Sequence, residues 1–201
     1  MATPQRTEKI HRLVRQRQQG VVVLEDINDP HNAGAVFRTC DALGFHDIHI
    51  IFEQQTPRFD PHADVKASST AVNRWLNFHV HHTTKDCLQA LKANGYELIA
   101  TILDDTSESL FEAELLTPKT ALMMGNEHRG LSDTAIQMAD RKLILPMAGM
   151  AQSMNLSVTT ALFLFEISRQ RHQAGIDAYR LSPSEQQALL DKYLDRESAE
   201  K

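Results

Sequence analysis

The stretch VVVLEDINDPHNAGAVFRTCDALGFHDIHIIF, residues 21–52, has the pattern of two strands joined by a helix. Its first residues are mainly apolar and β-branched, which predicts a buried strand over residues 21–26. Apolar side chains at helical spacing follow, and Gly44 stands where a left-handed cap would end the helix. The run IHIIF, residues 48–52, predicts a second strand. Such a strand–helix–strand unit is typical of a parallel sheet.

The alternation of strands and helices continues beyond this unit. Further strands are predicted at residues 96–103, 120–125 and 142–146, and further helices at residues 84–95, 132–140 and 155–175. Ser182 and Glu185 form a capping box around Pro183, so a last helix begins there. The predicted fold class is therefore α/β: a parallel sheet covered by helices on both faces, plus N- and C-terminal helices.

The domain division follows from this pattern and from the charge distribution. We expect a basic N-terminal helical extension at residues 1–19, one central domain at residues 20–175, and a C-terminal helical extension at residues 176–201. With 201 residues, 42% of them hydrophobic, the chain can bury one well-packed core. Residues 53–75 are polar and contain two prolines, which predicts a loop with one short helix near residues 63–71.

Composition also indicates the compartment. No apolar run approaches the ~18 residues that a membrane span needs, and residues 1–20 lack the apolar core of a signal peptide. We therefore expect a cytoplasmic protein. Cys40 and Cys87 lie far apart in different predicted helices, which indicates neither a disulfide framework nor a metal knuckle. We interpret both as reduced packing residues.

Net charge argues against a protein that coats nucleic acid, because the formal value is −5 and phosphate binding usually leaves a basic footprint. The first segment nevertheless concentrates cations that oppose only one acid. These cations are Arg6, Lys9, Arg12, Arg15 and Arg17. The segment is either a local RNA-binding patch or the solvated face of an amphipathic helix whose apolar side faces the body.

Three polar or glycine-rich loops follow predicted strands: NDPHNAG, GNEHRGLS and PMAGMAQSMN. In parallel sheets, ligands bind outside the carboxyl ends of the strands. The three loops are therefore expected to lie on one side of the molecule and to form a site.

Several kinds of chemistry do not fit these loops. Neither a dinucleotide fingerprint nor a P-loop is present. The cluster of His79, His81 and His82 suggests zinc, but acids and cysteines are not at ligand spacing, so no metal is expected. Ser153 and Ser157 lack the nucleophile elbow of a serine hydrolase.

The polar residues of the loops form three blocks. Asn32 and Arg38 belong to the first, Glu127 to the second, and Ser153 and Asn155 to the third. The segments NDPHNAGAVFRTCDALG, ALMMGNEHRGLS and LILPMAGMAQSMNLSVTTAL resemble, in the same order, the three motifs of the SpoU branch of the SPOUT RNA methyltransferases. The resemblance covers roughly residues 20–175, which would then be a SPOUT methyltransferase domain.

The resemblance implies features that periodicity does not show. SPOUT enzymes thread the C-terminal part of the domain through a loop and form a deep trefoil knot, a rare exception to un-knotted topology. S-adenosyl-L-methionine would be the methyl donor, with Gly125 allowing its close approach and Glu127 stabilising the loop. A homodimer is implied, in which Arg38 approaches the partner's cofactor. An apolar stripe on the last predicted helix of the domain would supply contact surface: Val158, Ala161, Leu162, Phe165 and Ile167.

The catalytic set implied by the resemblance is Arg38, Asn32, Glu127, Ser153 and Asn155. Arg38 would either accept or relay the proton of the ribose hydroxyl, or stabilise the alkoxide electrostatically. The residues alone leave structural alternatives open. Arg38 could pair with Asp41, the asparagines and serine could cap helices, and Glu127 could be a solvated turn residue.

Cofactor and RNA contacts are implied in the same way. The cofactor set is Thr101, Leu103, Gly125, Ile144, Met147, Ser153 and Leu156, whose apolar members could instead be plain core. The RNA-binding set is Arg6, Lys9, Arg12, Arg15, Arg17 and Arg38. The two terminal helices resemble most those family members that methylate guanosine 18 in the D-loop of tRNA. Ribosomal RNA, the tRNA wobble position and a non-catalytic RNA-binding role are the alternatives.

Overall fold

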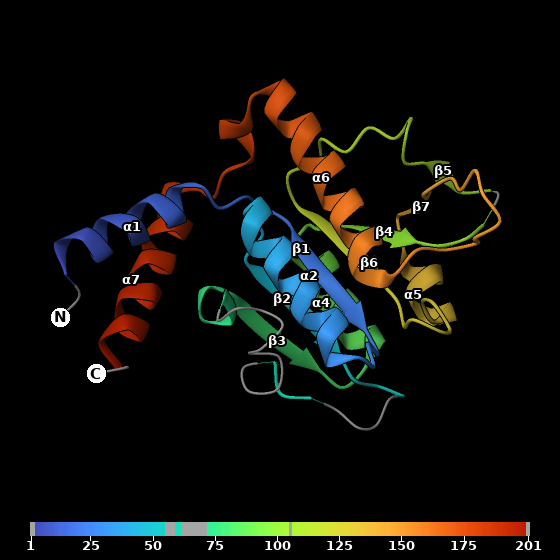
Figure 1. Ribbon diagram of the computed structural model, residues 1–201, viewed down its shortest axis with the longest axis horizontal. Helices are drawn as coiled ribbons and strands as arrows, with labels where there is room; N and C mark the ends of the chain where they lie inside the picture. Colours follow the sequence, from blue (N-terminus) through green and yellow to red (C-terminus); the bar gives the residue numbers. More distant parts are fainter. Residues whose placement is uncertain (1–2, 55–58, 62–71, 105, 200–201) are drawn as a thin grey trace.

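The computed structural model describes residues 3–54, 59–61, 72–104 and 106–199. Its centre is a seven-stranded sheet in the order β3-β2-β1-β6-β4-β7-β5, in which all neighbours are parallel (Figure 1). The strands are β1 (Val21–Glu25), β2 (Asp47–Ile51), β3 (Asn77–His81), β4 (Glu97–Thr101), β5 (Glu108–Ser109), β6 (Thr120–Met124) and β7 (Arg141–Ile144). The predicted parallel sheet is confirmed.

Helices cover both faces of the sheet, as predicted. Figure 1 shows α2 and α6 in front of the strands and α4 and α5 behind them. The α-helices are α1 (Pro4–Arg15), α2 (Pro30–Leu43), α4 (Thr84–Ala93), α5 (Asp133–Met138), α6 (Leu156–Ala174) and α7 (Pro183–Ala199), and the 3-10 helices are η1 (Val72–Trp75) and η2 (Ile176–Tyr179). None of the helices in the described ranges is both long and apolar enough to cross a bilayer.

Local signals in the sequence account for the helix ends. Gly44 ends α2 with a left-handed φ of 88°, which an L side chain rarely adopts. Ser132 caps α5 by accepting from the amide of Ala135. At the start of α7, the Ser182 amide donates to the Glu185 carboxylate and the Glu185 amide donates to the Ser182 hydroxyl. This is the predicted capping box.

The all-apolar run of β1 is explained by burial on both sides. Val22 and Leu24 belong to the core under α2 and α6, whereas Val21 and Val23 belong to the core under α4 and α5. A strand that is buried on both faces reads as continuous apolar sequence rather than as an alternation. The prediction of a buried strand at this position is therefore confirmed.

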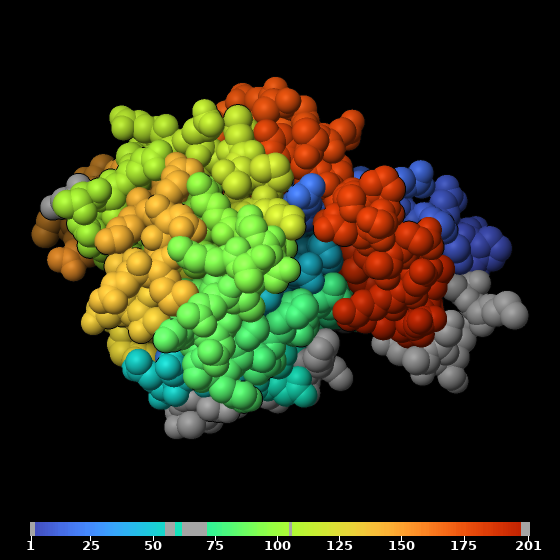
Figure 2. Space-filling view, turned by 180° about the vertical axis from the view of Figure 1, so that it is seen from behind, coloured from blue at the N-terminus to red at the C-terminus, as the bar shows by residue number. Residues whose placement is uncertain are grey.

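A third apolar cluster lies outside the sheet, between α1 and α7. Ile10 and Val14 of α1 pack with Leu189, Leu190 and Tyr193 of α7. Figures 1 and 2 both show the two helices side by side, next to the sheet domain. The N-terminal segment is thus an amphipathic helix whose apolar side is covered by the C-terminal helix.

Arg17 is not available to RNA, which corrects one predicted contact. Its side chain is fully buried, and its guanidinium pairs with Asp41 at 2.7 Å and donates to the Trp75 carbonyl at 2.9 Å. A buried cation must be paired and hydrogen-bonded to offset its desolvation, and the two terminal nitrogens of Arg17 meet this condition inside the protein. Arg17 therefore fastens α1 to the sheet domain.

Arg171 on α6 is also fully buried, and it meets carbonyl oxygens instead of an acid. Its guanidinium donates to the carbonyls of Gln19, Thr117 and Pro118 at 2.7, 2.8 and 2.9 Å. Burial lowers the pKa of Arg171 to about 10, so the side chain stays charged at neutral pH. Arg171 joins the segments that precede β1 and β6.

The described residues include only part of the predicted loop at residues 53–75. The helix expected near residues 63–71 lies outside the described residues. The segment that follows it forms the 3-10 helix η1. On α6, Ile167 is buried in the core, so it does not belong to the predicted contact stripe. Val158, Leu162 and Phe165 of that stripe are exposed.

Candidate active site

The three polar loops do lie at one end of the sheet. They follow β1, β6 and β7 at the carboxyl ends of these strands, and β4 lies between β6 and β7. Because the strands are parallel, the segments that leave them emerge on the same side. The sequence-based prediction of a common edge is confirmed.

Glu127 ties the first two loops together. Its carboxylate accepts from the backbone amides of Asn28 and Asp29 at 3.2 and 3.3 Å, and from the side-chain amide of Asn32 at 3.0 Å. The alternative of a solvated turn residue is therefore wrong. Asn32 is not the cap of α2 either, because Asp29 takes that place.

Asn155 connects the third loop to the same network. Its side-chain amide donates to the Asn32 side chain at 3.0 Å, while its oxygen accepts from the Ser157 amide and caps α6. Asn155 therefore both caps α6, as the structural alternative had it, and links the third loop to the first. Ser153 is exposed and makes no hydrogen bond with the residues that the structure describes.

The loop after β6 closes on itself. Asn126 and Gly130 exchange backbone hydrogen bonds at 3.0 and 2.9 Å. A side-chain carbon at Gly125 would overlap the backbone of Gly130 and Leu131. The family resemblance implied that this glycine allows close approach of the cofactor. The structure gives a different reason, because the loop's own backbone occupies the space.

Asp26 is a site residue that sequence analysis missed. It stands directly after β1 with a positive φ of 50°, which is uncommon for a residue with a side chain. Its buried carboxylate accepts from the amides of Glu53 and Gln54 and pairs with Arg129 at 3.2 Å. Its carbonyl accepts from the Asn126 side chain at 2.8 Å. An acidic residue at the end of an apolar strand was the feature of the sequence that could have indicated this role.

Glu25, the last residue of β1, is the other missed acid. Its buried carboxylate accepts from the hydroxyl of Thr84 and from the amide and hydroxyl of Ser132. It therefore joins the start of α4 to the start of α5. Two adjacent buried acids hold the segments that surround the loop after β6.

Arg38 is exposed on α2 and makes no hydrogen bond or ion pair with any described residue. The alternative pairing with Asp41 is wrong, because the Asp41 carboxylate pairs with Arg17. Arg38 thus presents its charge to solvent, two helical turns along α2 from the start of the helix. Such a guanidinium is free to bind a phosphate or a developing oxyanion.

The predicted cofactor residues gather at neighbouring strand ends. Thr101 ends β4, Gly125 follows β6, and Ile144 ends β7. The Thr101 hydroxyl donates to the carbonyl of Met123 at 2.9 Å. Met147 and Leu156 are half-buried, whereas the Leu103 side chain is largely exposed. This surface is apolar and lies beside hydrogen-bonding loops, which suits a ligand with an aromatic base.

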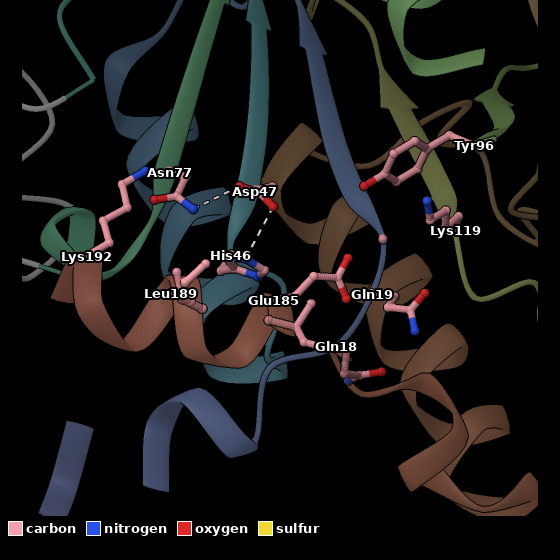
Figure 3. Close-up of a pocket in the computed structure, with 13 residues that line it drawn as sticks. Gln18, Gln19, His46, Asp47, Asn77, Tyr96, Lys119, Glu185, Leu189 and Lys192 are labelled. Atoms are coloured by element: carbon pink, nitrogen blue, oxygen red, sulfur yellow. Dashed lines mark hydrogen bonds and ion pairs between the residues drawn. The ribbon is translucent and has the colours of Figure 1, made fainter. Parts of the chain in front are cut away.

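A separate hollow lies at the opposite, amino-terminal end of the strands (Figure 3). It has a volume of about 240 Å³ and contains none of the predicted catalytic or cofactor residues. Polar side chains from several elements line it, including His46, Asp47, Tyr96, Lys119 and Lys192. Burial lowers the pKa of His46 to about 4, so this residue is neutral at pH 7.

Comparison with known proteins identifies the family. The model of the SpoU rRNA Methylase family matches residues 19–165, so the chain belongs to this family. The tRNA (guanosine(18)-2'-O)-methyltransferase of Escherichia coli strain K12 is 35% identical over an alignment of 191 positions that spans 93% of this chain and 81% of the relative.

Solved structures agree with this family. The TrmH/SpoU tRNA modifying enzyme of A. aeolicus has a TM-score of 0.82 at 29% identity and covers 94% of each chain. An AdoMet-bound rRNA methyltransferase from Sinorhizobium meliloti has a TM-score of 0.67 at 28% identity, covering 80% of this chain and 59% of that one. The α/β fold of the SpoU and TrmH enzymes, which the motif resemblance implied, is therefore confirmed.

The first prediction concerns Gly125. Gly125→Ala should destabilise the protein by about 3 kcal/mol, because the added carbon meets backbone atoms that side-chain rotation cannot move. Gly149→Ala is the matched control in the loop after β7. A side-chain carbon there meets no atom within 4 Å, so its effect should stay within about 0.5 kcal/mol. Urea unfolding of both variants measures the difference; equal unfolding midpoints would contradict the steric explanation.

Proposed function

We propose that this protein transfers a methyl group from S-adenosyl-L-methionine to the ribose 2'-oxygen of guanosine 18 in tRNA. One observation carries the proposal: Glu127, Asn32 and Asn155 form a continuous hydrogen-bond network that joins three motif loops, and Arg38 on the same helix as Asn32 is exposed and has no ion pair among the described residues. The name of the Escherichia coli relative supports the choice of nucleotide. With tRNA as the substrate, the proposed methyl transfer would take place in the cytoplasm.

The chemistry required of the protein is modest. S-adenosylmethionine supplies, when bound, an electrophilic sulfonium methyl group. The ribose hydroxyl is a poor nucleophile until it loses its proton. Guanidinium groups are ordinarily charged, so an arginine is a weak proton acceptor. We propose that its guanidinium stabilises the developing alkoxide, together with an RNA phosphate that takes up or relays the proton.

The cofactor is proposed to bind at the ends of β4, β6 and β7. Half-buried Ile144, Met147 and Leu156 offer the apolar surface for an adenine ring. Thr101, Leu103 and Gly125 would contribute backbone contacts, and Ser153 would approach from the loop after β7. The AdoMet-bound structure from Sinorhizobium meliloti supports this choice of methyl donor.

A deep trefoil knot is part of the proposal. The fold matches the A. aeolicus enzyme over 94% of the chain, and the resemblance to SPOUT motifs implies that the segment from β6 to α6 is threaded. A crystal structure with continuous density through residues 120–165 checks the threading. The division into a central domain at residues 20–175 with helical extensions is proposed on the same resemblance.

The experiment for the reaction uses labelled S-adenosylmethionine and total RNA from a strain that lacks the gene, followed by mapping of the modified nucleotide. We expect 2'-O-methylguanosine in the D-loop of tRNA. Label in ribosomal RNA or at the wobble position would change the substrate but keep the chemistry. Methylation of a base would refute ribose chemistry.

The second prediction assigns the role of Arg38 in this assay. Arg38→Ala should reduce methyl transfer at least 100-fold while leaving cofactor affinity within about twofold, since Arg38 is proposed to act on RNA. Arg38→Lys should fail as well, because lysine keeps the charge but loses the planar fork. Near-normal turnover of the lysine variant would disprove a specific guanidinium role. Calorimetry with the cofactor is the control measurement.

The third prediction concerns a homodimer, which is proposed because α6 exposes Val158, Leu162 and Phe165 on one side. Substituting Leu162→Glu and Phe165→Glu together should convert a dimer into monomers, because a charge would be buried at the interface. Light scattering measures the change. Phe111→Glu is the matched control, since Phe111 is also exposed but lies outside α6. A wild-type protein that is monomeric at micromolar concentration would refute the dimer.

The fourth prediction concerns RNA docking by α1. Arg6 is engaged with Glu197 and lies over the Trp75 ring, and Arg15 donates to the carbonyl of His11. Lys9 and Arg12 are exposed and have no ion pair in the described part of the chain. These two residues are therefore the proposed phosphate contacts of the predicted RNA-binding set.

Replacing Lys9 and Arg12 by Gln should weaken tRNA binding and reduce its salt-dependence slope by roughly 1 to 2, because two phosphate contacts are lost. Lys85→Gln on α4 controls for a general loss of charge. Deletion of residues 1–19 is less informative, since it would also remove buried Ile10, Val14 and Arg17. An unchanged slope in the double variant would exclude α1 from the RNA surface.

A further inference from the structure

Three possible metal ligands meet behind the sheet, away from the proposed methyl-transfer residues. The Nδ1 atom of His49 lies 2.9 Å from the Nε2 atom of His81, and the sulfur of Cys87 lies 3.9 Å from His49 Nδ1. All three ligand atoms lie within 4.8 Å of one another. His49 comes from β2, His81 from β3 and Cys87 from α4.

The parallel register explains how distant residues come together. His49 pairs with His79 across β2 and β3, and His81 follows two residues later on the same face. The ring of His49 lies between those of His79 and His81, at centroid distances of 4.6 and 5.1 Å. Helix α4 packs over this face and brings in the buried Cys87.

From this cluster we infer a binding site for a zinc-like divalent ion, with His49, His81 and Cys87 as three protein ligands and water as the fourth. Imidazole nitrogen and thiolate sulfur are the donors that zinc prefers, and three protein ligands plus water complete a tetrahedron. The sequence indicated no metal, because ligand spacing along the chain does not show which residues meet across the sheet.

The geometry is close to that of a zinc site. With Zn–N of about 2.05 Å and Zn–S of about 2.3 Å, tetrahedral ligands stand about 3.3 Å apart for two nitrogens and about 3.6 Å for nitrogen and sulfur. His49 and His81 would open by about 0.4 Å, and Cys87 would approach His49 by about 0.3 Å. The ligand atoms of Cys87 and His81, which lie within 4.8 Å of each other, would approach by up to about 1.2 Å. Such shifts are within the reach of side-chain rotation.

Protonation states suit the histidines. Burial lowers the pKa of His49 to about 3 and also lowers that of His81, so both rings are neutral at pH 7. Without metal, one ring donates its N–H to the other. Metal binding requires that this ring move its proton to the other nitrogen, which is a change of tautomer.

The thiol must lose its proton to the solvent when the metal binds. Burial and the carboxylate of Glu25 raise the pKa of Cys87 to about 12, so the proton is held tightly without a metal. A divalent cation offsets both effects, and its affinity should therefore rise with pH. The other charged or titratable groups near the site are His79, His82, Asp47 and Asp86.

A bound ion would stabilise the contact between β2, β3 and α4. β3 is at the edge of the sheet, and the ligands would fasten it to β2 and α4. Cys87 is also close to Glu25, which holds Ser132 at the start of α5. The site therefore adjoins the residues that support the loop after β6, without supplying a group to the proposed reaction.

Cobalt(II) is the probe for this site, used on the full-length chain without a histidine tag. Titration should give the visible bands of tetrahedral cobalt and a near-ultraviolet band from thiolate to metal, and added zinc should remove both. Zinc should also raise the unfolding temperature. Cys87→Ser should abolish the thiolate band, and His81→Ala should weaken binding at least about 100-fold.

His79→Asn is the matched control, because His79 lies on the same face of β3 but is not one of the three ligands. It should retain the thiolate band with less than about threefold loss of affinity. Circular dichroism confirms that each variant is folded. In the wild-type protein, bound zinc should protect Cys87 from alkylation. This measurement needs no variant. No thiolate band, or an equal band in Cys87→Ser, would overturn the site.

Discussion

The carboxylate of Glu127 is the meeting point of the proposed active site. It accepts two backbone amides from the loop after β1 and the side chain of Asn32 from α2, and Asn32 in turn accepts from Asn155 at the start of α6. Hydrogen bonds to a charged acceptor contribute roughly 1.5–3 kcal/mol each. One residue thus sets the relative positions of three loops that lie far apart in sequence, and Arg38 is carried on the helix that they hold.

The parts of the structure that depend on local signals could be read from the sequence. The apolar run of β1, the glycine that ends α2 and the capping box of α7 each act within a few residues. The position of each polar loop directly after a predicted parallel strand then indicated that the three loops share an edge. The family resemblance implied that Asn32 and Glu127 belong to one catalytic set, and the structure adds the direct contact between their side chains.

The missed or wrong predictions all concern partners across the fold. Arg17 looked like one more cation of a basic helix, because nothing nearby in sequence shows that Asp41 and the Trp75 carbonyl enclose it. The proximity of His49 to Cys87 depends on strand register and on the placement of α4. Asp26 was treated as the end of a strand, although its carboxylate organises the following loops.

The packing of α1 against α7 affects how the protein is made. During synthesis α1 leaves the ribosome early, with Ile10 and Val14 exposed, and its partner residues in α7 appear only after the sheet domain has been translated. Until then a basic helix with an uncovered apolar side is open to wrong contacts, including those with other nascent chains. Completion of α7 therefore closes the fold, and ribosome stalling before residue 183 would leave a product prone to capture by chaperones.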